Sequence, residues 1–441
     1  MTAPVGRAGV FAALCTLSLA VPLFGPQVGA GVAGVVLLGA YLVPEGPLFD
    51  LLAYPGDYED ARLYGLITFV LAGVALGLIA TAASMSVAVF VGTILLVGYG
   101  NLGEQLVRLR TDSDVVRVAG FCLAGSAAAV AGLAGTRALA GDPVATALPV
   151  VVFLAASGAF LAALLRDMLL RSDDPIVVLS VGLLLWLLAE LGPSVGRLEI
   201  VVALAVTVAL GYASYSLETA SVAGMLTGVL LVLLTIVLGG YGWVAVLVSF
   251  FAIGGLSTKF RYDRKTELGV AEDNNGARGS GNVLGNAAVA LVAVLGYAAS
   301  DAGLLPYEPE LFLFAFAGSI ATAMSDTLSS EIGSVFDRPR LITTLEPVEP
   351  GTDGGVTWQG ELAGLTGAVV VAAIAAGVFP EIDLVGGAIV AAAGVVGMTV
   401  DSLLGATLEG PLLGNQSVNF FATLSGALAS AALVVVVPLL G

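Results

Sequence analysis

The chain has 441 residues, of which 58% are hydrophobic and only 11% are charged. Its mean hydropathy is +1.02, whereas soluble domains carry about 25% charged residues, so the composition excludes a soluble globular protein and indicates one that crosses a membrane many times. With 33 acidic against 16 basic residues, the chain lacks the basic patch that nucleic-acid binding requires. It contains no histidine, so any metal should be held by oxygen, which favours Mg²⁺ or Mn²⁺.

Runs of about 17 to 22 apolar residues predict an all-α polytopic membrane protein with about fifteen transmembrane helices. The first run follows Arg7 and resembles a signal peptide, but no polar domain follows it and a second run begins almost at once. We therefore interpret it as the first membrane helix. In chain order, the predicted spans are 9–25, 28–44, 64–81, 82–100, 118–135, 146–165, 176–192, 199–215, 221–238, 240–256, 282–300, 310–326, 362–379, 383–403 and 418–440.

Basic residues gather in a few loops, and an even number of predicted spans separates each of these loops from the next. All of them should therefore lie on one side of the membrane, which the positive-inside rule assigns to the cytoplasm. The same count predicts a multi-pass protein of the cell membrane with a cytoplasmic N-terminus and an external C-terminus. The loops carry Arg108, Arg110 and Arg117; Arg166 and Arg171; Lys259, Arg261, Arg264, Lys265 and Arg278; and Arg338 and Arg340.

The acidic surplus and the scarcity of lysine indicate the kind of source. Only Lys259 and Lys265 are lysine, and loops such as "DLLAYPGDYEDA", residues 50–61, are strongly acidic. In molar salt, charge repulsion is screened within about 3 Å, so this composition is typical of a halophilic archaeon. The two cysteines lie far apart within predicted helices, so they offer neither a disulfide framework nor a zinc spacing.

The chain divides near residue 195, at "AELGPSVGRLE", into an N-terminal transmembrane region of residues 1–195 and a core of residues 196–441. Each part contains a hairpin of two apolar helices and a basic stretch, and then a helix that ends in aspartate, with "AALLRD" in the first part and "ATAMSD" in the second. A degraded internal duplication explains this pattern. Chance similarity between hydrophobic hairpins explains it equally well, so both interpretations stay open.

Polar segments follow several predicted helices of the core. The stretch "STKFRYDRKTELGVAEDNNGARGSGNVLGN", residues 257–286, carries five basic residues. These residues either bind phosphate groups or anionic lipid heads, or they only determine topology. The glycines and asparagines favour binding, because exposed backbone N–H groups in such turns can hold anions.

The segment "SDTLSSEIG", residues 325–333, follows a nearly uncharged apolar run, so its carboxylates stand where the hydrocarbon should end. On a continuing helix Asp326, Ser329, Ser330 and Gly333 share one face. Glu331 converges with Asp326 only if the helix ends or bends between them. Carboxylate and hydroxyl oxygens suit a partly hydrated Mg²⁺. A polar helix end with a capping role is the alternative.

Two further segments complete the polar set. In "EPVEPGTDGGVTWQGE", Thr352 and Asp353 lie among glycines, whose backbone can approach a triphosphate closely. In "DSLLGATLEGPLLGNQSVNF", Asp401 ends a long apolar run much as Asp326 does. Two aspartates at helix ends on one side of the membrane suggest a shared metal or substrate site, although a capping role explains Asp401 equally well.

Six ordered segments of residues 196–441 resemble the motifs of the phytyl-phosphate kinase family, which also includes the animal transmembrane protein nineteen. They are "STKFRYDRKTELGVAE", "ARGSGNVLGN", "SDTLSSEIG", "PRLITT", "VEPGTDGGVTWQG" and "DSLLGATLEG", followed by "VNF". The layout is also similar to that of dolichol and phytol kinases. The resemblance implies a Mg²⁺-dependent kinase that transfers a phosphoryl group from CTP or another nucleoside triphosphate to a geranylgeranyl or phytyl phosphate held in the lipid bilayer.

The resemblance also implies which residues form the site. Asp326, Glu331 and Asp401 would be catalytic and would bind the metal. Nucleotide binding would fall to Lys259, Arg264, Arg278, Asn286, Ser330, Arg340, Thr352, Gly354 and Asn419. Two alternatives stay open: a cytidylyltransferase similar to CDP-lipid synthases, which would release pyrophosphate, and a secondary transporter, whose polar residues should concentrate at mid-membrane.

Overall fold

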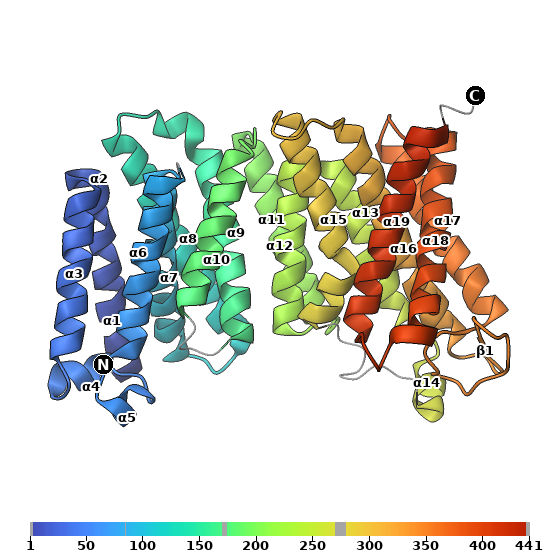
Figure 1. The fold of residues 1–441 in the computed structure, drawn as a ribbon, viewed down its shortest axis with the longest axis horizontal. Coiled ribbons are helices and arrows are strands. Elements are labelled where there is room, and N and C mark those ends of the chain that lie inside the picture. Colours follow the sequence, from blue (N-terminus) through green and yellow to red (C-terminus); the bar gives the residue numbers. More distant parts are fainter. Residues whose placement is uncertain (1–2, 84, 170–173, 270–278, 438–441) are drawn as a thin grey trace. The chain divides into compact units, whose positions relative to one another are not determined.

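The computed structural model describes residues 3–83, 85–169, 174–269 and 279–437, and the regular structure in these ranges is helical apart from one short β-hairpin. The predicted all-α polytopic fold is thus confirmed. The chain forms two compact units, Met1–Leu204 and Ala205–Gly441. Helix α11 (Arg197–Ser216) runs from the first unit into the second (Figure 1).

Helix α7 lies at the centre of the first unit, where it packs against α1, α8, α9 and α10. Most of its residues between Ala88 and Gly98 are buried, because Gly, Ala and Val side chains let neighbouring helices approach from several directions. The helices of this unit are α1 (Ala3–Thr16), η1 (Leu17–Leu19), α2 (Ala20–Phe24), α3 (Pro26–Leu42), α4 (Pro47–Leu52), α5 (Asp57–Asp60), α6 (Tyr64–Ala82), α7 (Val87–Arg108), α8 (Asp114–Leu139), α9 (Val144–Met168) and α10 (Asp174–Glu190).

Helix α16 has the central position in the second unit, in contact with α13, α15, α17, α18 and α19. The elements of this unit after α11 are α12 (Val222–Leu238), α13 (Tyr241–Ser257), α14 (Tyr262–Leu268), α15 (Ser280–Asp301), α16 (Pro309–Gly333), β1 (Arg340–Leu341), β2 (Gly355–Val356), α17 (Trp358–Val378), α18 (Leu384–Leu408) and α19 (Asn415–Val436). Side-chain caps start three of these helices, at Ser221, Thr357 and Asp383.

Glycines bring the neighbouring helices close to α16. A Cβ on Gly364 of α17 would lie 2.8 Å from the carbonyl oxygen of Ser325. A Cβ on Gly397 of α18 or on Gly426 of α19 would lie 2.2 Å or 1.9 Å from Thr322 Oγ1. Contacts of this kind between small residues drive helix association in a bilayer, where burial from water contributes little.

The number of spans differs from the expectation. Among the described residues, eleven helices are long and apolar enough to cross a membrane, or twelve if the bent pair α13 and α14 is one span. Every predicted span overlaps a helix, but the predicted count of about fifteen is not confirmed. Helices α3, α10 and α12 have 17 residues each in the described ranges, at the lower limit of about 17 residues for crossing the hydrocarbon.

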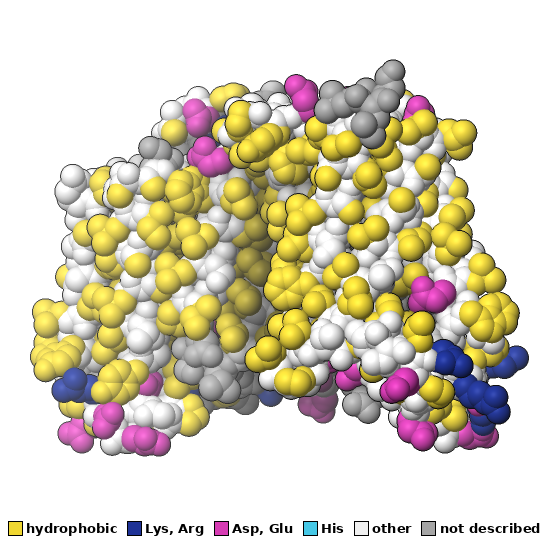
Figure 2. Space-filling view, turned by 45° about the vertical axis from the view of Figure 1, so that its right-hand side comes forward, with side chains coloured by type: hydrophobic (Ala, Val, Ile, Leu, Met, Phe, Trp, Pro, Cys, Tyr) yellow, Lys and Arg dark blue, Asp and Glu magenta, His cyan; other side chains and the backbone are white. Residues whose placement is uncertain are grey.

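The polar segments of the second unit gather at one of its ends (Figure 1). Helix α14, the β-hairpin and the start of α19 all lie there, so the two basic loops of this unit share one end. Hydrophobic side chains cover most of the flank that Figure 2 shows, as expected for a surface that faces lipid. The assignment of the polar end to the cytoplasm stays a prediction.

Candidate functional site

Two aspartates of the second unit lie in contact near its polar end. Asp326 on α16 and Asp401 on α18 each lie seven residues before the end of their helices, which is at Gly333 and Leu408. Their carboxyl groups lie close enough to interact directly. Two charged carboxylates in contact repel each other, so the pair needs a shared proton or a cation. Asp401 Oδ1 is buried and has no hydrogen-bond partner in the described part of the chain.

The packing of α16 on α18 explains why the two aspartates meet. Helix α17 runs back between them in the chain, so α16 and α18 point the same way. Gly397 contacts Thr322, and each of these residues lies one turn before its aspartate. The aspartates were expected where the helices end, but both helices continue for about two turns, so the pair lies about 10 Å before the helix ends.

A glycine-rich loop lies directly on α18 beside this pair. Strands β1 and β2 pair antiparallel and hold the base of the loop. Gly354 has a φ of +72°, which favours glycine. A Cβ there would lie 2.4 Å from Ala406 Cβ and 2.6 Å from the carbonyl oxygen of Ser402. The loop backbone thus packs against Ser402, the residue next to Asp401, and only glycine allows so close an approach.

Glu409, the residue after α18, interacts electrostatically with Asp353 of the loop and with Asp401. Burial raises the pKa of its carboxyl group above the ordinary 4.5, and the negative charges of Asp353 and Asp401 raise it further, whereas a hydrogen bond with Asn415 lowers it. Glu409 interacts with Asp353 of the loop, with Asp401 of α18 and with Asn415 of α19. The loop, the end of α18 and the start of α19 therefore form one connected polar region.

The starts of α15 and α19 adjoin at this end of the unit. Asn286 of α15 and Asn419 of α19, both predicted to bind the nucleotide, are buried. A Cβ on Gly285 would lie 2.8 Å from the carbonyl oxygen of Gln416, so the two helices touch here. Asn419 Nδ2 donates to Asn415 Oδ1 at 3.5 Å, and Asn415 also contacts Glu409.

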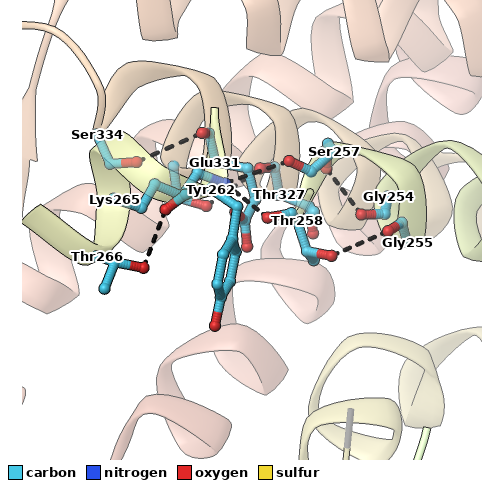
Figure 3. A network of polar contacts seen from close by, with 11 residues as sticks. Gly254, Gly255, Ser257, Thr258, Tyr262, Lys265, Thr266, Thr327, Glu331 and Ser334 are labelled. Atoms are coloured by element: carbon cyan, nitrogen blue, oxygen red, sulfur yellow. Dashed lines mark hydrogen bonds and ion pairs between the residues drawn. The ribbon is translucent and has the colours of Figure 1, made fainter. Parts of the chain in front are cut away.

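A buried lysine that was not among the predicted site residues lies beside α16 (Figure 3). Lys265 of α14 is only 2% exposed. Its Nζ donates to the carbonyl oxygens of Ser257 at 3.2 Å and Thr258 at 3.1 Å, and it forms an ion pair with Glu331 of α16. An ammonium group has three donors, so these partners satisfy it completely.

This ion pair separates Glu331 from the aspartates. Helix α16 neither ends nor bends before Gly333, so the five residues from Asp326 to Glu331 turn the side chain by about 140° around the helix axis. Among the described residues, no group of three or more Asp, Glu or Cys side chains could hold a metal ion. Of the three predicted metal ligands, the structure therefore brings together only Asp326 and Asp401.

Two predicted basic residues of the site, Lys259 and Arg340, are exposed, and Arg264 is partly exposed. Figure 2 shows Lys and Arg side chains gathered at one end of the molecule's surface. Lys259 is exposed just after α13. Arg264 forms an ion pair with Asp337 at 3.3 Å. The Nη1 of Arg340 donates to the carbonyl oxygen of Leu345 at 2.6 Å, which braces the hairpin.

The remaining predicted residues have local roles in the structure. The Ser330 hydroxyl donates to the carbonyl oxygen of Thr327 at 3.2 Å, and the Thr352 hydroxyl donates to that of Glu349 at 2.7 Å. Arg278 lies outside the described residues. Taken together, the site consists of a pair of membrane-embedded carboxyl groups, a glycine-rich loop that packs on α18 beside them, and basic side chains at the same end of the unit.

These features define a polytopic all-α membrane protein with a polar site at one end of its second unit. Residues 205–427, just over half of the chain, match the family described as "Integral membrane protein DUF92", and the chain belongs to that family.

Three relatives illustrate the breadth of this similarity. The chain is 35% identical over 195 residues to an uncharacterized membrane protein of Methanocaldococcus jannaschii, covering 43% of this chain and 75% of the relative. It is 36% identical over 203 residues to one of Synechocystis, covering 45% and 76%. It is 34% identical over 137 residues to the chloroplastic protein VTE6 of Arabidopsis thaliana, covering 31% and 40%. No solved structure matches the chain significantly.

Proposed function

We propose that the chain is a membrane-embedded kinase that transfers a phosphoryl group from CTP, or another nucleoside triphosphate, to an isoprenoid monophosphate. The contact between Asp326 and Asp401 beneath the glycine-rich loop is the observation that carries this proposal. Phosphoryl transfer needs little covalent chemistry from a protein, but it needs the charge of the phosphates neutralised and the acceptor aligned. A carboxyl pair beside exposed backbone and cations supplies groups for both tasks.

The aspartate pair fits a magnesium ion. Both ligands are carboxylates, and the buried Oδ1 of Asp401 has no hydrogen-bond partner in the described residues. Mg²⁺ is commonly bound by one or two carboxylates together with water and substrate phosphates, so two protein ligands suffice. When bound, the ion would neutralise charge on the triphosphate, while Asp326 and Asp401 hold it at the membrane-embedded end of the site.

The other residues would bind the two phosphate substrates. Backbone N–H groups of residues 351–355 and the side chains of Lys259 and Arg340 would hold the triphosphate. An oxygen of the acceptor phosphate attacks the γ-phosphorus, the bond to the β,γ-bridging oxygen breaks, and the nucleoside diphosphate leaves. The acceptor phosphate is already ionised at neutral pH, so the reaction needs no strong general base, in keeping with a chain without histidine.

The position of the pair suits a substrate that is itself in the membrane. An isoprenoid chain dissolves in the hydrocarbon and leaves only its phosphate near the surface, and the aspartates lie about 10 Å before the helix ends. The resemblance of the motifs to those of phytyl-phosphate kinases supports the same substrate class. The polar residues concentrate at one end of the unit rather than at mid-membrane, which favours a kinase over a transporter.

Product analysis tests this proposal. Purified protein is incubated with Mg²⁺, labelled CTP or ATP, and geranylgeranyl phosphate, and the products are resolved. A kinase gives the nucleoside diphosphate and an isoprenoid diphosphate. Pyrophosphate together with a CDP-linked lipid would instead show a cytidylyltransferase, and the absence of any Mg²⁺-dependent product from both nucleotides would overturn both enzymatic assignments.

A further inference from the structure

The buried ion pair of Lys265 and Glu331 joins two parts of the second unit that are distant in sequence. Lys265 lies on α14 and Glu331 on α16, and both side chains are largely buried, with 2% and 12% of their surface exposed. We infer that this pair is a positioning clamp, which holds the basic elbow of residues 257–268 against the last turns of α16, beyond Asp326. The functional part of this inference rests on the proposed function.

The elbow itself is an unusual piece of backbone that needs support. Helices α13 and α14 meet at an angle of 64°. Between them, Arg261 has a φ of 48°, in the left-handed region that a residue with a side chain adopts only when its surroundings enforce it. The Lys265 ammonium group bonds to Ser257 and Thr258, whose carbonyl groups stand at the negative end of α13, and so closes the elbow from inside (Figure 3).

The burial of the pair points to positioning rather than to simple stability. Removing two charges from water is costly, and apolar residues of similar size often stabilise a fold as well or better. A buried pair does give a defined geometry, because only one arrangement satisfies both charges. Here it fixes α14 on α16 at Glu331, between one and two turns beyond Asp326.

Two further contacts hold the outer side of the elbow against the segment after α16. The guanidinium group of Arg264 pairs with Asp337, and that of Arg261 lies 6.0 Å from the centre of the Phe336 ring. These contacts are exposed and therefore weak, so the buried pair should dominate the positioning. The clamp thereby sets where Lys259 and Arg261, both exposed, stand relative to the proposed triphosphate site.

The inference distinguishes Glu331 from a metal ligand, the role expected from sequence. A ligand of the metal should behave like Asp326 when it is replaced, and its loss should raise the Mg²⁺ concentration that the enzyme requires. A clamp residue should behave like its partner Lys265, and its loss should raise KM for the nucleotide with less effect on kcat. Because the two groups act as one unit, losing both should cost no more than losing either.

The experiment compares Lys265→Met, Glu331→Gln and the double variant, with Asp263→Asn as a matched control on the exposed side of α14. Each protein is purified in detergent, and two quantities are measured: deuterium uptake by amides 257–268, and the kinetic constants for Mg²⁺ and CTP. We expect faster uptake in all three clamp variants and unchanged uptake in the control. We also expect KM for CTP to rise between about tenfold and a hundredfold, the range that misplacement of a binding group produces.

The possible results distinguish a failure of the clamp inference from a failure of the proposed kinase function. If Glu331→Gln requires more Mg²⁺ while Lys265→Met keeps normal kinetics, Glu331 is a metal ligand and the clamp is wrong. Unchanged deuterium uptake in the clamp variants would also overturn it, whatever the activity. If the wild-type protein lacks kinase activity but the uptake changes as expected, the proposed function fails, whereas the structural clamp stands.

Discussion

The carboxyl groups of Asp326 and Asp401 interact directly, although α17 and the glycine-rich loop separate them in the chain. Each residue lies on a long apolar helix, where a lone carboxylate is costly. Their contact joins α16 and α18 into one site, in which each carboxyl group has the other as its partner. The first prediction concerns the charge of these two groups.

Replacing either aspartate by asparagine keeps the shape of the side chain and removes its charge. We expect Asp326→Asn and Asp401→Asn each to lower kcat about a hundredfold or more, as for other groups that stabilise charge in a transition state. The double variant should lose little beyond either single one, because both act through one site. The measurement is the rate of nucleoside diphosphate release with geranylgeranyl phosphate.

Asp301→Asn is the control for this pair, because Asp301 is an exposed aspartate at the last residue of α15. Its activity should match that of the wild type. Near-normal rates in both Asp326→Asn and Asp401→Asn, with the proteins folded in detergent, would reduce the pair to a packing feature and remove the proposed metal site.

Two glycines with left-handed backbone, one in the glycine-rich loop and one after α18, offer a second prediction. Gly354 and Gly410 have φ values of +72° and +83°. A Cβ at Gly354 would clash with Ala406, whereas one at Gly410 would meet nothing within 4 Å. Gly354→Ala should therefore displace the loop and abolish turnover, while Gly410→Ala should cost only about 1 kcal/mol of backbone strain.

Activity and thermal unfolding of the two alanine variants are measured side by side. Equal losses of activity in both would mean that backbone strain alone explains the effect. In that case the close packing of the loop on α18 would have no functional weight.

The fold was largely predictable because hydropathy reports burial in lipid directly, and each apolar run became a helix. The length of the helices beyond the apolar runs was not predictable in this way. Helix α16 continues through Asp326 to Gly333, because contacts with α17 and the cap at Thr357 stabilise a polar last turn that hydropathy assigns to a loop. The expected convergence of Asp326 and Glu331 failed for that reason.

The site was predictable only where each residue stood out alone. Asp326 and Asp401 interrupt apolar runs, and glycines mark the loop. Lys265 looked like one cation among several in a basic stretch, since its partner Glu331 is distant in sequence. A local signal did exist, because Tyr262, Lys265 and Leu268 recur every three residues and share the less exposed face of α14.

A third prediction concerns pH. The pKa of Glu409 in the folded protein is raised above its ordinary 4.5, chiefly by burial. At pH values between 4.5 and the raised pKa, the folded protein therefore binds more protons than the unfolded one. The stability that Glu409 contributes is therefore present at and below pH 4.5 and is lost as pH rises through the raised pKa. Glu409→Gln carries no such charge, and above this window it should unfold at a higher temperature than the wild type.

Thermal unfolding is followed against pH in detergent with a chelator present, so that no metal compensates the charge. The difference between Glu409→Gln and the wild type should shrink as the pH falls toward 4.5, the ordinary value for glutamate. A difference that stays constant, or grows on acidification, would show that the pKa of Glu409 is not raised in the folded protein.

A fourth prediction tests the side on which the site lies. Thr266, Asp353 and Gly410 are exposed in three separate segments at the polar end of the second unit. With both native cysteines replaced by alanine, a cysteine at each of these positions should react with a membrane-impermeant reagent only after the cytoplasmic face is opened. Labelling of all three from outside would show that the polar end faces outward. Labelling from different sides would show that the three segments do not share one side of the membrane.

The first unit provides the last prediction, because it contains a charged cluster of its own. Arg166 of α9 forms an ion pair with Asp174, lies 3.5 Å from Glu104 and donates to Asn101 Oδ1 at 3.0 Å. The neighbouring Asp167 is exposed. If this unit is a degraded duplicate without catalytic function, Asp167→Ala should leave turnover within a few fold.

Arg166→Met should instead destabilise the protein by about 3 to 5 kcal/mol, because it leaves the buried carboxylate of Asp174 without its cation. The two variants are compared by thermal unfolding and by turnover per folded molecule. A collapse of turnover in Asp167→Ala, with unfolding unchanged, would show that the first unit supplies a residue to the reaction. The duplication would then be the wrong interpretation of "AALLRD", and the two units would be parts of one catalytic machine.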